Sequence, residues 1–121
     1  MAYTILTKQF SASTFRLPLT ADGSAYLLCK PIFATKVHDI TAKAIAECGF
    51  DSNIASRLIV ERLLEASVSG WSGLNDINGD KIEYSTEMIR EICEADPEFA
   101  MAQVERIRRI AREARLEEEK N

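Results

Sequence analysis

Two runs of apolar residues at helical spacing, each followed closely by a glycine, limit most strongly what this chain can fold into. In the first run, over residues 37–48, apolar positions recur every three or four residues and Gly49 follows. The second run starts at Asp51 or Ser52 and continues to Val68, two residues before another glycine. Such spacing places apolar side chains on one helix face, and glycine commonly follows a helix end. We therefore predict two consecutive helices, and the broader apolar face of the second makes it the centre of the core.

Helix-start signals occur twice more in the C-terminal half. Ser85 or Thr86 can cap a third helix, because a short polar side chain there accepts hydrogen bonds from the first helical turn. Asp96 and Pro97 then end this helix and start a fourth, since proline costs nothing at the first helical position. The charged residues 117–121 at the end of the fourth helix are predicted to form a frayed tail.

The N-terminal part contains short apolar runs instead of a helical pattern. Residues 14–31 hold two such runs on either side of the sequence Ala-Asp-Gly-Ser at 21–24, and Asp-Gly in this place indicates a hairpin. Pro18 and Pro31 lack a backbone donor, so both strands are predicted to be short and edge-like. The predicted fold is one α+β domain over residues 1–116, mainly helical with about four helices, carrying a small N-terminal β-hairpin.

Composition narrows the classes of function. The 15 Lys+Arg against 19 Asp+Glu give a formal net charge of -4, so there is no general attraction to nucleic-acid phosphates. The three cysteines lie far apart among apolar neighbours, which is typical of free thiols in a reducing cytoplasm. The chain has no run approaching the ~18 apolar residues of a membrane span, and no signal-peptide pattern. We expect an intracellular protein that does not bind membranes.

The sequence offers no constellation that predicts catalysis. His38, the only histidine, lies in a helical pattern with lysines and has no nucleophile motif near it. Asp76, Asn78 and Gly79 match part of a calcium loop, but the carboxylates required at its first and twelfth positions are missing. A turn in which Asn78-Gly79 supplies a positive φ and Asp76 bonds nearby backbone fits better. We predict a protein that is not an enzyme and has no metal or cofactor.

Trp71, the only tryptophan, lies between Gly70 and Gly73 just before this turn. Its ring can fold back over the preceding helix and fix the connection. We therefore predict that Trp71 is a largely buried anchor of the core and not an exposed recognition residue.

The fourth predicted helix carries the candidate partner-binding residues. Its apolar side chains recur at spacings of three and four and share one face, whereas its arginines lie mainly around the other. We expect the N-terminal half to dock on the domain and the stripe to become exposed beyond about Ile110, where it could bind a partner or a second copy. The candidate residues are Val104, Ile107, Ile110, Ala111 and Ala114.

Several of these features follow one another in a recognisable order. A β-rich N-terminal segment ends in proline, a helical middle follows, and a helix then runs into the pattern V-x-GW-x-G-x-x-D-x-x-G, followed by YS-x-E and a short helix. The pattern consists of Val68, Gly70, Trp71, Gly73, Asp76, Gly79, Tyr84, Ser85 and Glu87. This arrangement resembles the tail assembly chaperones of long-tailed bacteriophages. The resemblance spans about residues 15–110, and its distinctive part is 71–87.

The resemblance implies a function without catalysis. Such chaperones bind the long, hydrophobic tape measure protein in the host cell cytoplasm, keep it soluble and help recruit tail tube protein subunits. They are generally absent from the mature virion. The alternative hypothesis is a small phage or bacterial nucleic-acid-binding or regulatory protein that uses the arginine face of residues 106–115. The glutamates interleaved there and the negative net charge argue against this alternative.

Overall fold

The computed structural model describes the backbone of residues 14–49 and 51–120, and the side chains of these residues up to 113. The elements, in chain order, are β1 (Phe15–Pro18), β2 (Tyr26–Cys29), α2 (Ala34–Glu47), α3 (Ser52–Ser67), β3 (Val68–Ser72), α4 (Thr86–Ala95) and α5 (Pro97–Lys120). Four helices and a small antiparallel sheet confirm the predicted α+β, mainly helical class. None of the helices described is both long enough and apolar enough to cross a membrane.

The sheet has the strand order β1-β2-β3, and both pairings are antiparallel. The hairpin of β1 and β2 was predicted, but the prediction that both are edge strands is wrong for β2, which lies between the other two. The sequence also placed Val68 at a helix end and Trp71 in a loop, whereas both belong to β3. The physical reason is long-range pairing: Trp71 lies opposite Leu27, far away in sequence, and a local pattern does not show such a partner.

One arginine of α5 contacts the free edge of β1. The backbone N–H of Leu19 donates to the carbonyl of Ala25 at 2.8 Å, and bonded and non-bonded positions alternate along an antiparallel pair. The backbone groups of Pro18 therefore point away from β2, where a missing N–H does no harm. The Pro18 carbonyl accepts a hydrogen bond from the Arg106 guanidinium at 2.6 Å. An arginine of the last helix thus occupies part of an edge that could otherwise pair with another strand.

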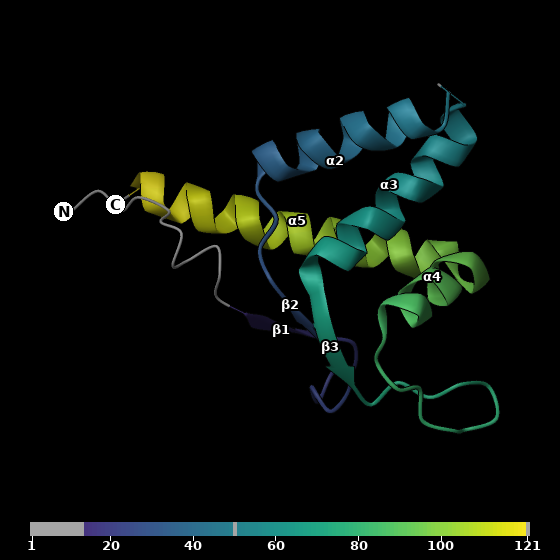
Figure 1. The fold of residues 1–121 in the computed structure, drawn as a ribbon. Helices are drawn as coiled ribbons and strands as arrows, with labels where there is room; N and C mark the ends of the chain where they lie inside the picture. The colour runs from purple at the N-terminus through teal and green to yellow at the C-terminus, as the bar shows by residue number, and fades with distance from the viewer. Residues whose placement is uncertain (1–13, 50, 121) are drawn as a thin grey trace.

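The core lies between the sheet and the helices α3, α4 and α5 (Figure 1). Helix α3 packs against α2, α4, α5 and β3, so its predicted central position is confirmed. Its N-cap is Asp51, whose side chain accepts from the backbone N–H groups of Asn53 and Ile54. The largest buried cluster comprises Leu17, Leu27, Cys29, Ile32, Leu63, Leu64, Val68, Ile89, Ala100, Val104 and Ile107.

Helix α5 differs from its prediction in how far it is docked. Val104, Ile107 and Ala111 are only 8%, 1% and 5% exposed, so these three candidate partner-binding residues face the protein's own core. Docking of Val104 and Ile107 agrees with the predicted N-terminal docking, but the stripe is not exposed directly beyond half-buried Ile110, since Ala111 is still buried. Small size explains the correction, because the alanine at 111 lets α5 approach its neighbours closely. The side chain of Ala114 lies outside the described ones.

The C-terminal part of α5 includes most of the predicted tail. The helix continues to Lys120, so residues 117–120 form its last turn in this structure. The described residues share one continuous core, as a single domain requires. The domain limit at 116 and the fraying of the tail stay predictions.

Candidate protein-binding site

The loop between β3 and α4 is built around the carboxylate of Asp76. Its Oδ1 accepts hydrogen bonds from the backbone N–H groups of Asn78 at 2.9 Å and Asp80 at 3.0 Å. The N–H of Gly79, a residue with φ of 85°, donates to the Asp76 carbonyl at 3.0 Å. These contacts confirm the predicted turn, in which Asp76 bonds nearby backbone. Within the described parts of the chain, no group of three or more His, Cys, Asp or Glu side chains is arranged to hold a metal ion.

Gly73 fixes the start of this loop against the β1–β2 turn. Its φ is +79°, and a Cβ at this position would lie 2.8 Å from the Ala25 Cα and 3.0 Å from the Ser24 carbonyl oxygen. A side chain is therefore excluded both by conformation and by space. Gly70 is different, because a Cβ there would make only an ordinary contact at 3.9 Å with Leu28.

Trp71 and Tyr84 lie against each other beside the loop. The ring centroids are 5.0 Å apart and the rings stand at 81°, an edge-to-face arrangement. The indole N–H of Trp71 donates to the carbonyl of Ile82 at 2.9 Å, and the Tyr84 hydroxyl donates to the carbonyl of Val68 at 3.0 Å. Trp71 packs on the core and is mostly buried, with a minor part of the residue at the surface, which agrees with the predicted core anchor.

A small apolar hollow lies next to Trp71. It measures ≈ 20 Å³, and one water needs roughly 10–15 Å³ by the same measure. The hollow therefore fits the end of one apolar side chain and not a cofactor. None of its lining side chains ionises, and Gln103 accepts a hydrogen bond from Arg106 at 2.9 Å. The hollow is lined by Leu27, Leu64, Val68, Trp71, Leu74, Ile89, Ile92, Phe99 and Gln103.

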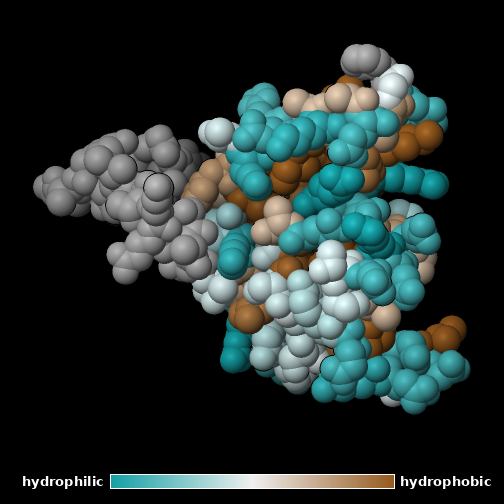
Figure 2. Space-filling model, in the orientation of Figure 1, coloured by the Kyte–Doolittle hydropathy of each residue, from teal (hydrophilic) through white to brown (hydrophobic). Residues whose placement is uncertain are grey.

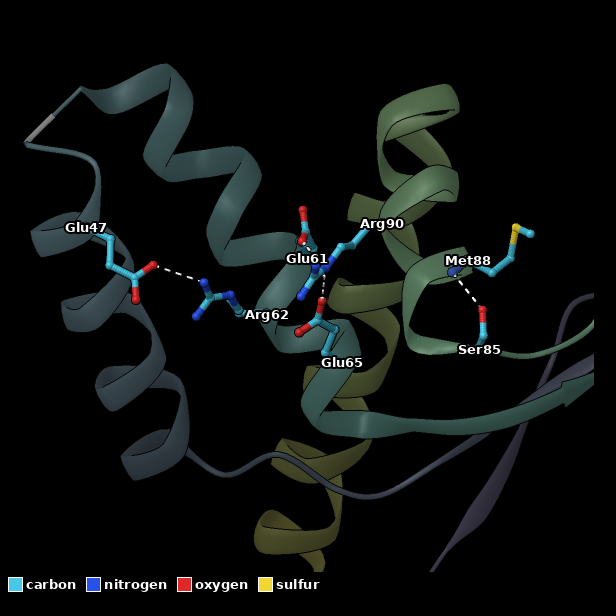
Figure 3. A network of polar contacts seen from close by, with 7 residues as sticks. All are labelled: Glu47, Glu61, Arg62, Glu65, Ser85, Met88 and Arg90. Carbon is cyan, nitrogen blue, oxygen red and sulfur yellow. Dashed lines mark hydrogen bonds and ion pairs between the residues drawn. The ribbon is translucent and has the colours of Figure 1, made fainter.

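Ion pairs join neighbouring helices (Figure 3). The Nε atom of Arg90, on α4, lies 3.1 Å from a Glu61 oxygen and 3.0 Å from a Glu65 oxygen, both on α3. Arg62 of α3 contacts Glu47 of α2 at 3.0 Å. Burial, and then the neighbouring Glu65 carboxylate, raise the pKa of Glu61 above its usual value. Arg90 thus forms ion pairs with two glutamates of α3, and these contacts link α4 to α3.

The cysteines carry no sign of activation. Burial raises the pKa of Cys29 to about 11, and burial together with the charges of Glu61 and Glu65 raises that of Cys93 to about 11. A thiol in such an environment stays protonated near neutral pH and is a poor nucleophile. All three cysteines are free, and Cys48 is half-buried. His38 is exposed on α2.

The arginines of α5 have divided roles. Arg106 is engaged with Pro18 and Gln103, and Arg112 lies 4.0 Å from Glu105. Arg108 and Arg109 are exposed, and in the described part of the chain neither forms an ion pair. Among the described arginines of this face, Arg106 is thus held by the protein's own residues, and the other three are exposed.

Sequence patterns did not single out several residues of this site. The hollow brings together Ile92, Phe99 and Gln103 from α4 and α5 with Leu74 from the loop. The only local signal for them was the apolar spacing of the helices, which does not tell a buried position from the rim of a hollow. No protein-family model matches the chain, and no similar protein was found among curated proteins or among solved structures.

Proposed function

We propose that this protein is a tail assembly chaperone of a long-tailed bacteriophage. In this function it binds the tape measure protein in the host cell cytoplasm, keeps it soluble and assists assembly of the tail tube, without catalysis. Two features support the proposal. One is the order of sequence motifs around Trp71, and the other is the apolar hollow beside this residue.

The observation that carries the proposal is the apolar hollow beside Trp71. Its lining offers no ionisable group for a charged substrate, and its size matches the end of an aliphatic side chain. Trp71, which is partly exposed, lines the hollow, and exposed Tyr84 packs against Trp71; aromatic side chains of this kind commonly anchor protein interfaces. Such a surface suits weak, repeated contacts with apolar residues of a long partner.

Co-expression with the tape measure protein from the same phage genome tests the proposal. The wild type should shift the tape measure protein from the insoluble to the soluble fraction. Ile92→Ser changes a half-buried residue that lines the hollow, and should reduce the soluble yield of tape measure protein. The matched control is Ile54→Ser, at a residue 55% exposed on α3 that does not line the hollow.

Circular dichroism on both variants separates folding from binding. A folded Ile92→Ser protein that holds the tape measure protein as well as the control does would remove the hollow from the binding surface. A wild type that leaves the tape measure protein insoluble and does not co-purify with it would defeat the chaperone function.

A further inference from the structure

Gln103 is the only residue with an amide side chain among those that line the hollow beside Trp71. On the face that Figure 2 shows, hydrophobic colour occurs in several separate places among hydrophilic residues, so apolar surface alone does not single out a binding site. A polar group in the wall of an apolar hollow is more informative, because such groups fix the orientation of what binds there. The other polar group of the lining, the Trp71 N–H, is already bonded to the carbonyl of Ile82.

Arg106 decides which way the Gln103 amide points. The Nη1 atom of Arg106 donates to the Gln103 side-chain oxygen at 2.9 Å, and a guanidinium can only donate. The oxygen must therefore face Arg106, so the two orientations of the amide are not equivalent here. Arg106 is itself held by the carbonyl of Pro18 at 2.6 Å. The Gln103 nitrogen consequently points away from Arg106 in a fixed direction.

The Gln103 nitrogen is a free donor in a nearly buried place. Gln103 is only 7% exposed, yet among the described residues its amide nitrogen has no acceptor. In the same part of the chain, no fully buried side-chain nitrogen or oxygen lacks a hydrogen-bond partner. The nitrogen must therefore keep some accessible surface, and the hollow is the accessible space that Gln103 lines. Covering such a donor without giving it an acceptor is unfavourable.

The hollow and the free donor together define the chemistry of a ligand. The hollow takes the end of one aliphatic side chain, and the N–H group in its wall needs an acceptor. Every residue of a peptide carries a backbone carbonyl close to its side chain. Inside a helix this carbonyl already accepts from the N–H four residues later. A free carbonyl beside an aliphatic side chain is therefore a property of an extended segment.

We propose that Gln103 determines the specificity of the hollow. Its side-chain nitrogen donates to a backbone carbonyl of an extended segment, while an aliphatic side chain of the same segment enters the hollow. The identity of this segment as part of the tape measure protein rests on the proposed function, whereas its chemistry rests on Gln103. An aliphatic side chain in the middle of a helix binds more weakly, because it would cover the Gln103 nitrogen without giving it an acceptor.

Nuclear magnetic resonance on the purified full chain tests the proposal without any phage partner. The probe is N-acetyl-leucine methylamide, which carries one aliphatic side chain between two backbone carbonyls. At millimolar concentrations it should shift the side-chain amide signals of Gln103 until they saturate. N-acetyl-alanine methylamide has the same carbonyls but only a methyl group. It should bind at least about tenfold more weakly, since most of the apolar contact is lost.

Gln103→Glu is the sharpest variant, because it keeps an oxygen for Arg106 and replaces the donor by an acceptor. It should bind the leucine compound about tenfold more weakly, followed by the indole N–H signal of Trp71. The matched control is Asn53→Asp, which changes the charge equally at an exposed residue of α3 away from the hollow, and should bind like the wild type. Gln103→Met removes the donor without adding charge, and should show the same weakening if the glutamate impairs folding in circular dichroism.

The outcomes for this proposal and for the chaperone function are distinct. Equal affinity of the wild type and the Gln103 variants for the leucine compound would overturn the proposal, as would the absence of any shift at Gln103. A wild type that binds the leucine compound but does not hold the tape measure protein would support the proposal and defeat the chaperone function. If the wild type and Gln103→Glu hold the tape measure protein equally well, the proposal fails and the chaperone function stands.

Discussion

Replacement of Gly73 by alanine tests how the loop is fixed against the hairpin. Two costs add up at this position. The φ of +79° is a conformation that costs a residue with a side chain about 1–2 kcal/mol. The new Cβ would also lie 2.8 Å from the Cα of Ala25, a backbone atom that does not swing aside as the end of a side chain can. Forced overpacking of this kind costs about 1–3 kcal/mol.

The expected loss for Gly73→Ala is therefore about 2–5 kcal/mol in the free energy of unfolding, measured by urea denaturation followed by circular dichroism. Because a typical domain is stable by only about 5–15 kcal/mol, this is a large part of the total. At about 4 °C per kcal/mol for a chain of this size, Tm should fall by roughly 8–20 °C.

Gly79→Ala is the matched control. Its φ of +85° is similar, but no atom lies within 4 Å of the added Cβ. It should therefore show the conformational cost alone, about 1–2 kcal/mol. Equal losses for the two variants would refute the contact between Gly73 and the hairpin, and a smaller loss for Gly73→Ala would refute the whole argument.

Four further predictions follow from the same contacts. Trp71→Ala should lower the free energy of unfolding by about 3 kcal/mol, the low end for large aromatic truncations, because the residue is mostly but not fully buried. An unchanged Tm would make the ring purely a recognition residue. Asp76→Ala should destabilise by about 1–2 kcal/mol, and the wild type should bind no calcium; micromolar binding in a calorimetric titration, abolished by this substitution, would contradict the structural role. Hydrogen bonds, first that from Thr20, lower the pKa of Asp22 from 3.8 to about 2. The stabilisation by the ionised Asp22 should therefore be present above pH 3.8 and lost as the pH falls towards 2. Asp22→Asn should make the free energy of unfolding less dependent on pH between 2 and 3.8, and a pH dependence equal to that of the wild type would exclude this linkage. Ile107→Asp should unfold the monomer, because the side chain is 1% exposed; a folded variant that fails only in association would return this face to partner binding.

Local patterns were sufficient for the helices and the first hairpin. Helical spacing and caps predicted α2 to α5 close to their observed limits, since Ser85 caps α4 and Pro97 starts α5 as expected. The sequence Asp22-Gly23 predicted the turn of the hairpin. In the structure, the Asp22 carboxylate accepts hydrogen bonds from Thr20 and Ser24 in this turn. These signals act over a few residues, so a single sequence displays them.

What the sequence did not show depends on contacts between distant segments. The strand β3 is short, and it exists because β2 offers a second edge to pair with. The burial of Ala111 depends on how closely α5 approaches its neighbours, and an alanine on a helix face is compatible with either outcome. For the same reason, the sequence placed the end of the docked part of α5 at about Ile110, whereas Ala111 is still buried in the core. The hollow beside Trp71 depends on the ends of several elements meeting, which no spacing rule describes.

The motif around Trp71 divides into positions with different physical roles. Gly73, Asp76 and Gly79 hold the loop in shape through backbone conformation, close approach and hydrogen bonds. Trp71 and Tyr84 bind the neighbouring backbone while leaving part of their rings at the surface. The pattern D-x-x-G leaves Ile77 unspecified, although it is the side chain that the loop exposes most. It follows that the positions named by the motif hold the loop in shape, and that Ile77 contributes little to that shape. Ile77→Ser should therefore leave the free energy of unfolding almost unchanged, whereas Gly73→Ala should lower it markedly.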